Sequence, residues 1–562
     1  MTASTDIAPR KNANTLAARI GWAALICATL YVCYFSHLGA IGFVGPDEPR
    51  YAWIARDMAE TGDWVTPRLY GRPWFEKPPL YYWGAAICFK LFGVSEAAAR
   101  LPSAISALLA TLAMAWLAWR VYGAETARWL LLLLPTTVGM IGFSHAAATD
   151  MPFSAMLTIA MVCAAVIVGL VPERSSQDGA QHAAPLLDGR LVAPRGWLAP
   201  ILFGFFLGLA VLAKGPAAII LCVGAVFFWA LFTKRWRDAL LLLHPAAISA
   251  FCLTALPWYI LCARRNPDFF RIFIIEHNFK RYLTPEFQHI QPFWFYVPVL
   301  LAAFLPWTVG MLAVFVDLPW RSPLNVFFLS LGLFPVLFFT LSQSKLPGYI
   351  LPALPPLAWL LATTVSLAAK WPHKTLVAAA CAITSAALAI AIERSAAHRA
   401  FGTDIIPAAW TTNVWFPLLI AGFLAGILVL LRRPFTCLYA VQVGVLLAAW
   451  GLSSGLIWMD PQLSARGVIA ASRTDVESLA STDIFVYDLP RGIHYGLNFY
   501  LRREIPEWET GTHGLVFSSW KGQSRLQAEG YACQQHLVFP AAFLCKKAEA
   551  SAAHASGSGK PQ

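Results

Sequence analysis

The stretch that decides the fold is residues 150–172, which read DMPFSAMLTIAMVCAAVIVGLVP. After Asp150 at its start, this run contains no charged residue. An α-helix needs about 20 consecutive apolar residues to cross the hydrocarbon core of a bilayer. The stretch therefore predicts a membrane-spanning helix with one carboxylate at its mouth.

The composition extends this interpretation to the whole chain. Of 562 residues, 58% are hydrophobic and only 13% are charged, about half of the roughly 25% charged residues that soluble domains contain. A soluble protein of this length could not bury so much apolar surface, and an aromatic content of 14% argues against disorder. Continuous apolar runs also favour helices over a β-barrel, whose strands alternate. We therefore expect a polytopic α-helical membrane protein.

The apolar runs predict about thirteen transmembrane helices of about 17–25 residues each. If the first helix starts in the cytoplasm, every loop from an even to an odd span carries Lys or Arg, as the positive-inside rule requires. The same rule accounts for the net charge of +12. No basic stretch has the interleaved aromatic residues of a nucleic-acid groove, so we expect no nucleic-acid partner. The expected spans lie near residues 20–40, 97–119, 127–144, 150–172, 198–213, 216–232, 239–263, 292–316, 323–341, 350–369, 374–392, 413–431 and 435–458.

Three domains are expected from the change in composition along the chain: a transmembrane domain over 1–459, a small soluble α/β domain over 460–547 and a disordered tail over 548–562. In the soluble domain a helix-like run precedes four strand-like runs. Cys533 and Cys545 lie in this domain and could pair outside the cytoplasm, although two free thiols fit equally well. The helix-like run is 463–479, and the strand-like runs are 483–489, 493–501, 514–520 and 536–539.

The first outer segment, residues 41–96, is too long to be a simple loop. Its stretches 48–61 and 79–92 are amphipathic, which suits helices that lie in the membrane interface. We therefore expect juxtamembrane helices in this segment.

Six short polar clusters fall on the predicted outer face. Together they bring carboxylates and several cations to one boundary of the membrane. A sugar carried on a long-chain phosphate needs both kinds of group, because cations hold the phosphate leaving group and carboxylates hold the sugar or act as a base. The clusters are residues 45–51, 74–82, 148–152, 213–216, 276–282 and 342–349.

Each cluster also has a plain structural interpretation. Asp47 and Asp150 each precede a helical run, where a carboxylate can cap the helix. Lys214 can reach towards the interface from a turn, and Lys345 is the lone charge between two apolar spans.

The remaining charged groups leave similar alternatives open. Glu76 and Lys77 are either a surface pair or part of a lipid-phosphate site in which Lys77 is a point charge. Arg281 could hold a phosphate through two hydrogen bonds. His277 and Glu76 would make a partial metal site, but two ligands are weak evidence, and a hydrogen-bonded histidine explains His277 as well.

At these residues the sequence resembles the bacterial aminoarabinose (4-amino-4-deoxy-L-arabinose) lipid A transferases, within the protein mannosyltransferase-like (GT-C type) integral-membrane glycosyltransferases. The order of the motifs, the expected spans and the soluble tail also match, so the resemblance covers residues 20–500. The motifs are Gly45-Pro-Asp-Glu-Pro-Arg-Tyr51, Phe75-Glu-Lys-Pro-Pro-Leu-Tyr81, Thr149-Asp-Met-Pro152, Ala213-Lys-Gly-Pro216 and Ser344-Lys-Leu-Pro-Gly-Tyr349.

This resemblance implies an undecaprenyl-phosphate-linked sugar as donor and a lipid A phosphate as acceptor, at the periplasmic face of the bacterial inner membrane. Such a modification weakens cationic antimicrobial peptides such as polymyxin. The resemblance implies Asp47 and Asp150 as the acidic catalytic residues and Lys77 as the lysine that contacts the lipid phosphate. Further substrate-binding candidates are Glu48, Arg50, Tyr51, Tyr81, Lys214, Arg281, Lys345 and Tyr349.

Other functions stay open from sequence. A transferase of the same fold could move a polyprenyl-phosphate hexose to a protein or another glycolipid. A lipid or solute transporter would instead place ionisable groups at the bilayer midplane in two related halves, which this sequence does not show. We expect a monomer surrounded by membrane lipids, with no cofactor required apart from a divalent metal that Glu76 and His277 would hold.

Overall fold

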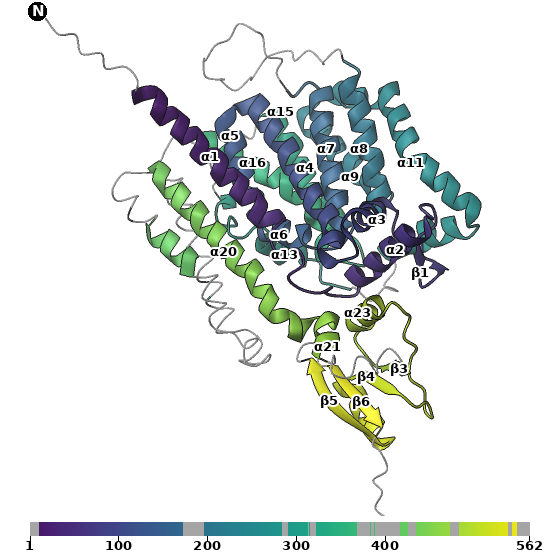
Figure 1. Ribbon diagram of the computed structural model, residues 1–562. Coiled ribbons are helices and arrows are strands. Elements are labelled where there is room, and N and C mark those ends of the chain that lie inside the picture. The colour runs from purple at the N-terminus through teal and green to yellow at the C-terminus, as the bar shows by residue number, and fades with distance from the viewer. Residues whose placement is uncertain are drawn as a thin grey trace, which may run out of the picture.

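A computed structural model describes residues 10–171, 196–283, 290–312, 322–367, 416–424, 434–471, 483–537 and 542–547, together with a few isolated positions. The described chain is mostly helical, with a small sheet domain at one end (Figure 1). Five of its helical segments are long and apolar enough to cross a membrane. These are α4 (Glu96–Tyr122), α7 (Asp150–Ile167), α11 (Pro245–Arg265), α15 (Pro323–Thr340) and the segment Pro347–Ser366, which η4 (Pro347–Ala353) and α16 (Leu354–Leu367) form.

Further apolar helices accompany these spans and correspond to other runs expected from sequence. A polytopic helical membrane protein is therefore confirmed, whereas the count of thirteen spans stays a prediction. The expected span at 374–392 lies almost entirely outside the described residues, and that at 413–431 is described at 416–424 and residue 427. These apolar helices include α1 (Arg10–Tyr34), α8 (Leu198–Lys214), α9 (Ala217–Thr233) and α20 (Pro434–Leu463). Other described helical segments are α10 (Trp236–Ala239), η1 (Leu240–Leu243), η2 (Arg271–Lys280), α12 (Arg281–Leu283) and α13 (Tyr296–Ala303).

Several expected boundaries were wrong for identifiable reasons. The run 127–144 is two helices, α5 (Ala124–Leu133) and α6 (Val138–Ser144), which meet at 65°. The helix expected over 292–316 is broken after Ala303, just before Pro306, because proline cannot donate the next helical hydrogen bond.

The first helix also ends earlier than expected, at Tyr34 rather than near residue 40. The carbonyl oxygens of Leu38, Ile41 and Gly42 accept hydrogen bonds from the Arg100 side chain on α4. These bonds satisfy the backbone without a helix, so the chain can turn towards the first outer segment.

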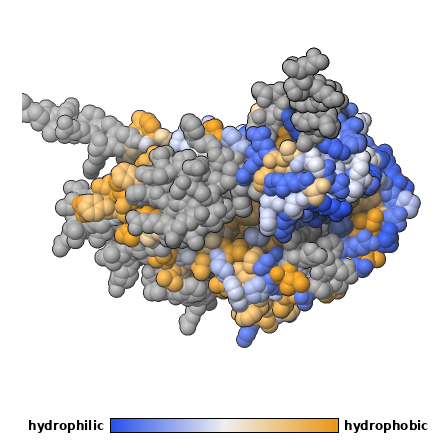
Figure 2. Space-filling view, turned by 90° about the horizontal axis from the view of Figure 1, so that it is seen from below, coloured by the Kyte–Doolittle hydropathy of each residue, from blue (hydrophilic) through white to orange (hydrophobic). Residues whose placement is uncertain are grey.

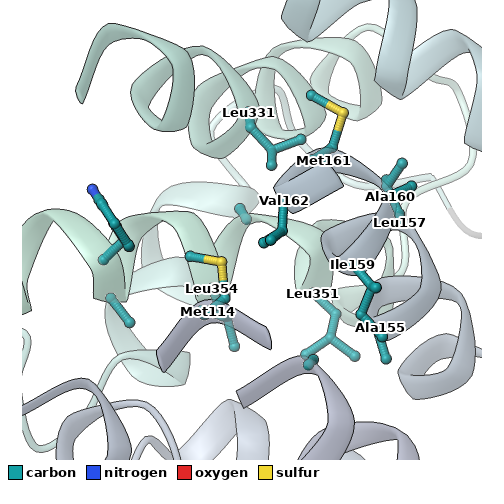
Figure 3. Close-up of a cluster of buried hydrophobic side chains, with 14 of the residues drawn as sticks. Met114, Ala155, Leu157, Ile159, Ala160, Met161, Val162, Leu331, Leu351 and Leu354 are labelled. Carbon is teal, nitrogen blue, oxygen red and sulfur yellow. The ribbon is translucent and has the colours of Figure 1, made fainter. Parts of the chain in front are cut away.

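The membrane domain is held together by interdigitated apolar side chains from helices that are distant in sequence (Figure 3). Figure 3 shows Met114 from α4 and Val162 from α7 in the same cluster as Leu331 from α15 and Leu354 from α16. The most buried span is the Pro347–Ser366 segment, and α7 is nearly as buried. The helix predicted from residues 150–172 is therefore central to the fold.

The first outer segment forms two short helices that pack against one another, as expected. They are α2 (Asp47–Thr61) and α3 (Leu80–Phe92), and the strands β1 (Arg68–Leu69) and β2 (Arg72–Pro73) pair antiparallel between them. The two residues of the intervening turn, Tyr70 and Gly71, both have positive φ, the geometry that a two-residue hairpin requires. Buried aromatic side chains from both helices form a separate core beneath this segment.

The soluble domain is a four-stranded sheet with strand order β3-β4-β6-β5, covered by helices. The strands are β3 (Ile484–Tyr487), β4 (Leu515–Ser519), β5 (Tyr531–Leu537) and β6 (Ala542–Lys547), and the helices are α21 (Ala465–Ala471), α23 (Arg491–Leu501) and α24 (Trp520–Ala528). β3 and β4 are parallel, whereas β4, β6 and β5 pair antiparallel. Cys533 and Cys545 are joined by a disulfide between β5 and β6, which decides the alternative that the sequence left open.

One expected strand of the soluble domain was wrong. Residues 493–501 lie in the helix α23, whose buried residues Ile493, Leu497 and Asn498 fall on one face. A spacing of four residues is a helical period, and it outweighed the aromatic content that had favoured a strand. The expected domain limit at residue 460 also falls inside α20, which continues to Leu463.

The soluble domain lies against the first outer segment, where α23 contacts α2 and α21 contacts α23 (Figure 1). Seen from this end, Figure 2 shows hydrophilic residues gathered over one part of the face, with hydrophobic residues beyond them. The polar cluster at residues 45–51 therefore lies at the boundary between the membrane helices and the soluble domain.

Candidate active site

A cavity of about 350 Å³ opens between the membrane helices below the first outer segment. Its wall is largely apolar, and it brings together Lys77, Lys214, His277 and Tyr349 from four of the polar clusters predicted from sequence. An apolar cavity with a few convergent cations suits a ligand that has a hydrocarbon chain and an anionic head. The remaining lining residues are Pro216, Ala217, Ile220, Tyr282, Leu283, Phe338, Phe339, Ser342 and Ser344.

Asp150 and Lys214 form an ion pair at the inner side of this cavity. Asp150 is the first residue of α7, and Lys214 is the last residue of α8, which packs along α7. The Lys214 ammonium also lies 4.7 Å from the ring centre of Tyr349. The chain approaches Asp150 closely at Gly348, where an added Cβ would lie 2.6 Å from Oδ1. The motifs at 148–152, 213–216 and 344–349 are therefore parts of one site.

Arg50 joins the first two polar clusters. Its guanidinium pairs with Asp47 on α2, and its Nη1 donates to Glu76 Oε2 at 3.0 Å. The other oxygen of Glu76 lies 3.7 Å from Lys77 Nζ, which lines the cavity. Asp47 has a side chain that is 49% exposed, whereas those of Arg50 and Glu76 are 8% and 10% exposed. The accessible carboxylate of Asp47 is thus held by a buried network that begins at the cavity.

Burial and neighbouring charges shift the pKa values of Arg50 and Tyr51 in this network. Burial alone would lower the pKa of Arg50, but Glu76, Tyr51 and Asp47 raise it, so the guanidinium stays charged. Burial, reinforced by Glu76 and Asp47, raises the pKa of Tyr51 well above its usual value. Tyr51 is therefore a neutral hydroxyl at physiological pH, able to donate a hydrogen bond but not to act as an anionic base.

Neither predicted aspartate caps its helix through its side chain. The capping positions are Pro46 before α2 and Thr149 before α7, and neither makes a side-chain cap. Asp47 and Asp150 instead occupy the first helical position, where the helix dipole favours a negative charge. Asp47 pairs with Arg50 on its own helix and Asp150 pairs with Lys214 on α8, so the capping interpretation does not describe them.

Glu48 is buried and has a different environment from Asp47. Its carboxylate accepts hydrogen bonds from Arg100 Nε and Nη2, at 2.9 and 2.8 Å, and from the backbone nitrogens of Val44 and Ala147, at 2.8 and 2.7 Å. Two backbone donors and a bidentate guanidinium occupy both oxygens. The contacts thus make Glu48 a link between α2, α4 and the turn before Asp150, in place of the substrate contact expected from sequence.

Arg100 is the residue that sequence reasoning missed. It is 3% exposed and lies near the start of α4, inside a run that was interpreted as purely apolar. A charged residue within a predicted span is itself a functional signal, and that signal could have found Arg100. Tyr495, on α23, was also missed, and its ring centre lies 5.4 Å from the Arg50 guanidinium.

Three other predicted substrate contacts have different outcomes. Tyr81 is fully buried and donates to the carbonyl oxygen of Ala99 at 2.8 Å, which gives it a packing contact in place of the expected substrate contact. Lys345 is also buried, and its Nζ donates to the carbonyl oxygen of Ser342 at 2.6 Å, within its own turn. The backbone of Arg281 lies in α12, but its side chain lies outside the described residues.

The metal site suggested by Glu76 and His277 does not find a third ligand in the part of the chain that the structure describes. No group of three or more His, Cys, Asp or Glu side chains that could hold a metal ion occurs among these residues. Glu76 is moreover engaged by Arg50 and Lys77. Since a protein site for a divalent metal commonly has three or more protein ligands, we derive no step through a metal.

The geometry can be compared with known proteins. The family model described as dolichyl-phosphate-mannose-protein mannosyltransferase matches residues 20–273. The chain is 35% identical over 345 residues to the undecaprenyl phosphate-alpha-4-amino-4-deoxy-L-arabinose arabinosyl transferase of Erwinia tasmaniensis, covering 60% of this chain and 58% of that protein. The protein of that name from Pseudomonas aeruginosa is 34% identical over 344 residues, with the same coverage of both chains. This chain is similar to the protein mannosyltransferase family over a little under half of its length.

These matches agree with the resemblance that the motifs indicated. The solved structure of ArnT from Cupriavidus metallidurans bound to undecaprenyl phosphate has a TM-score of 0.72 and 22% identity, covering 94% of this chain and 98% of that one. At this identity the match shows a shared fold over most of the chain. The matched region spans a little under three fifths of the length of the curated relatives.

Proposed function

We propose that this protein transfers 4-amino-4-deoxy-L-arabinose from an undecaprenyl-phosphate carrier to a phosphate of lipid A. The observation that carries the proposal is the apolar cavity whose polar groups, Lys77 and Lys214, lie beside the carboxylates Glu76 and Asp150. The apolar wall suits a polyprenyl chain, the lysines suit its phosphate and the carboxylates suit an aminosugar. The names of the curated relatives support the same donor.

The donor phosphate is assigned to Lys77. Its side chain is 14% exposed and lines the cavity, and the Glu76 carboxylate at 3.7 Å holds it there. As the bond between the anomeric carbon and the donor phosphate oxygen breaks, the electron pair leaves with that oxygen. A fixed ammonium stabilises the developing charge most strongly where water is excluded. Lys77 therefore acts on the leaving group, and Arg281 is proposed as a second cation for it.

Asp47 and Asp150 are assigned to the sugar side of the reaction. An ionised acceptor phosphate needs no strong base, and its oxygen forms the new bond to the anomeric carbon as undecaprenyl phosphate leaves. Asp47, held by Arg50, is then an orienting and electrostatic group for the sugar and its amine. Asp150, paired with Lys214, faces the sugar from the opposite cluster. For a hydroxyl acceptor, Asp47 would instead be the general base.

We also propose that thirteen helices span the inner membrane and that the soluble domain lies in the periplasm. The disulfide between Cys533 and Cys545 supports this orientation, because disulfides persist in the periplasm and are rare in the cytosol. We also propose that the monomer is the active form.

A second candidate function is transfer of a polyprenyl-phosphate-linked hexose to a protein. The description of the matching family model favours it. The same cavity would hold that donor, so the two candidates differ only in sugar and acceptor.

The proposal is tested by reconstituting the purified protein in proteoliposomes with undecaprenyl-phosphate aminoarabinose and bisphosphorylated lipid A. Mass spectrometry should show lipid A carrying an added pentosamine. Lys77→Ala should abolish the product, whereas Lys90→Ala should not, because Lys90 is exposed at the end of α3. No pentosamine product from folded wild-type protein would overturn the proposed donor and acceptor, and product with a peptide acceptor would favour the second function.

A further inference from the structure

The helix α23 belongs to the soluble domain but is attached to the segment that carries Asp47. The Asn498 amide donates to the hydroxyl of Tyr70 at 2.9 Å, and Arg56 on α2 donates to the carbonyl oxygen of Phe499 at 3.0 Å. The Tyr500 hydroxyl donates to Glu96 at 2.7 Å. These bonds fix α23 against α2 along its C-terminal half.

The other end of α23 reaches the turn before Asp47. Gly492 approaches Gly45 so closely that an added Cβ would lie 2.9 Å from the carbonyl carbon of Gly45. Gly45 has a positive φ of 69° and lies two residues before Asp47. Any larger side chain at Gly492 would push the two segments apart. The soluble domain is thus packed directly on the loop that presents the accessible carboxylate.

A continuous row of groups leads from the cavity to this end of α23. It starts at Lys77, whose Nζ lies 3.7 Å from Glu76 Oε1. Glu76 Oε2 in turn lies 3.0 Å from Nη1 of Arg50. The guanidinium of Arg50 lies 5.4 Å from the ring centre of Tyr495, and that of Arg491 lies 6.0 Å from the same ring. At one end of the row, the partly buried Lys77 lines the cavity, and at the other end Arg491 is exposed.

The substitution at the anomeric carbon gives the two ends of this row, Lys77 and Arg491, different roles. When an acceptor oxygen attacks the anomeric carbon as the phosphate leaves, the two oxygens lie on opposite faces of that carbon. With the donor phosphate at Lys77, the acceptor must approach from the side of Asp47 and α23. Among the described residues, no carboxylate oxygen lies within 4.0 Å of the Arg491 guanidinium. Arg491 is therefore a cation available to an incoming anion.

We propose that Arg491, oriented by the ring of Tyr495, binds the phosphate monoester of the acceptor. The inference rests on the proposed function and adds that the soluble domain supplies part of the acceptor site. A planar guanidinium can hold a phosphate through two parallel hydrogen bonds. The guanidinium groups of Arg50 and Arg491 both lie close to the tyrosine ring, so the ring links the acceptor site to the network around Asp47.

The experiment measures the affinity of the full-length protein for bisphosphorylated lipid A by native mass spectrometry in detergent. Arg491→Gln should weaken binding about tenfold to a hundredfold, the loss expected for a charge-assisted hydrogen bond. Lys521→Gln removes the same charge from the same domain and should leave the affinity within about twofold, because the Lys521 ammonium lies over the neighbouring Trp520 ring and away from the proposed site. Arg491→Lys should recover part of the loss.

Two further arms identify the source of the phosphate and the role of Tyr495. Dephosphorylated lipid A and phosphatidylglycerol should both bind weakly, with no difference between wild type and Arg491→Gln. If Arg491→Gln weakened phosphatidylglycerol binding as much as lipid A binding, the site would attract anionic lipids in general, and the proposal would be overturned.

The role of Tyr495 is tested by transfer kinetics. Tyr495→Leu should raise the KM for the acceptor and leave the KM for the donor unchanged, whereas Tyr495→Phe should restore the wild-type value. A fall in kcat alone would contradict the positioning role.

The arms separate this inference from the proposed function. If wild type binds lipid A through Arg491 but transfers no pentosamine, the proposed function fails and the acceptor site stands. If wild type transfers the sugar while Arg491→Gln keeps the full acceptor affinity, the inference fails and the function stands. Wild type without measurable affinity for bisphosphorylated lipid A would also overturn the inference. Undecaprenyl phosphate binding, unchanged in every variant, shows that the membrane domain is folded.

Discussion

The carboxylate of Glu48 receives two hydrogen bonds from the guanidinium of Arg100, at 2.9 and 2.8 Å. The same carboxylate accepts a hydrogen bond from the backbone N–H of Ala147, which lies three residues before Asp150. Glu48 itself directly follows Asp47. The buried Glu48 carboxylate, held by Arg100, therefore ties the backbone beside Asp47 to the turn before Asp150.

Replacing Arg100 should destabilise the protein strongly. Arg100→Met leaves the Glu48 carboxylate buried without its cation, which costs about 3–5 kcal/mol. Thermal unfolding of the detergent-solubilised protein should show a much lower Tm. Arg72→Met is the matched control, because Arg72 pairs with Glu504 at the surface, where a pair contributes about 0–1 kcal/mol. Equal Tm values for the two variants would contradict the structural role of Arg100.

Adding one methyl group at Gly348 should impair transfer more than folding. The Cβ of Gly348→Ala would lie 2.6 Å from Asp150 Oδ1 and 2.9 Å from the ring of Phe143. Asp150 would have to move away from Lys214, and such overpacking costs about 1–3 kcal/mol. Displacement of an active-site carboxylate by about 1 Å can lower the rate about a hundredfold.

The control for this prediction is Gly142→Ala, since an added Cβ at Gly142 meets no atom within 4 Å. Initial rates of sugar transfer and Tm should be measured for both variants. Gly348→Ala with the wild-type rate would show that the position of Asp150 does not matter for the reaction.

Acidification should loosen α23 through His494. Burial lowers the pKa of His494 below its usual 6.5, although bonding to the Ile505 carbonyl and the nearby Glu507 and Glu504 oppose that shift. The unfolded chain then takes up a proton near pH 6.5 while the folded chain stays neutral, so stability is lost as the pH falls below about 6.5.

His494→Gln keeps a donor for the Ile505 carbonyl but does not titrate. Between pH 7 and pH 5, the Tm of wild type should fall more than the Tm of His494→Gln. Parallel curves would show that the buried histidine makes no contribution to the pH dependence.

Removing the disulfide should weaken the soluble domain. Cys533 and Cys545 are separated by 12 residues in sequence, and a loop of this size gives about 2–3 kcal/mol of stabilisation. Cys533→Ser with Cys545→Ser should lower the denaturant midpoint of the soluble domain, followed by tryptophan fluorescence, and leave donor binding unchanged. If both cysteines of the wild-type protein instead react with maleimide in permeabilised cells without a reducing agent, the bond is absent.

Much of the site was predictable because its residues occur in short motifs. Asp47, Lys77 and Asp150 were all found from polar clusters at span boundaries, and the structure places them around one cavity and its network. The interpretation of Glu48 was less successful, because a sequence motif does not reveal which of two adjacent carboxylates points inward. Its partner, Arg100, lies 52 positions away and belongs to no motif.

The fold shows the same limit. The period of apolar residues located the membrane helices, yet it could not show that the run 127–144 bends by 65° between α5 and α6. The short aromatic run 493–501 was misassigned because length and composition separate helix from strand poorly over so few residues. Tyr495 was missed for that reason, since only the helical assignment directs it towards Arg50.

The central claim, transfer of a sugar from a polyprenyl phosphate to a lipid A phosphate, is tested most directly in cells. Lipid A should be extracted from bacteria that lack the gene, carry it, or carry Asp47→Asn, and its mass measured with expression confirmed by immunoblot. The account predicts a pentosamine on a lipid A phosphate that requires both the gene and Asp47. Unmodified lipid A in cells that express the folded wild-type protein and make the donor would contradict it.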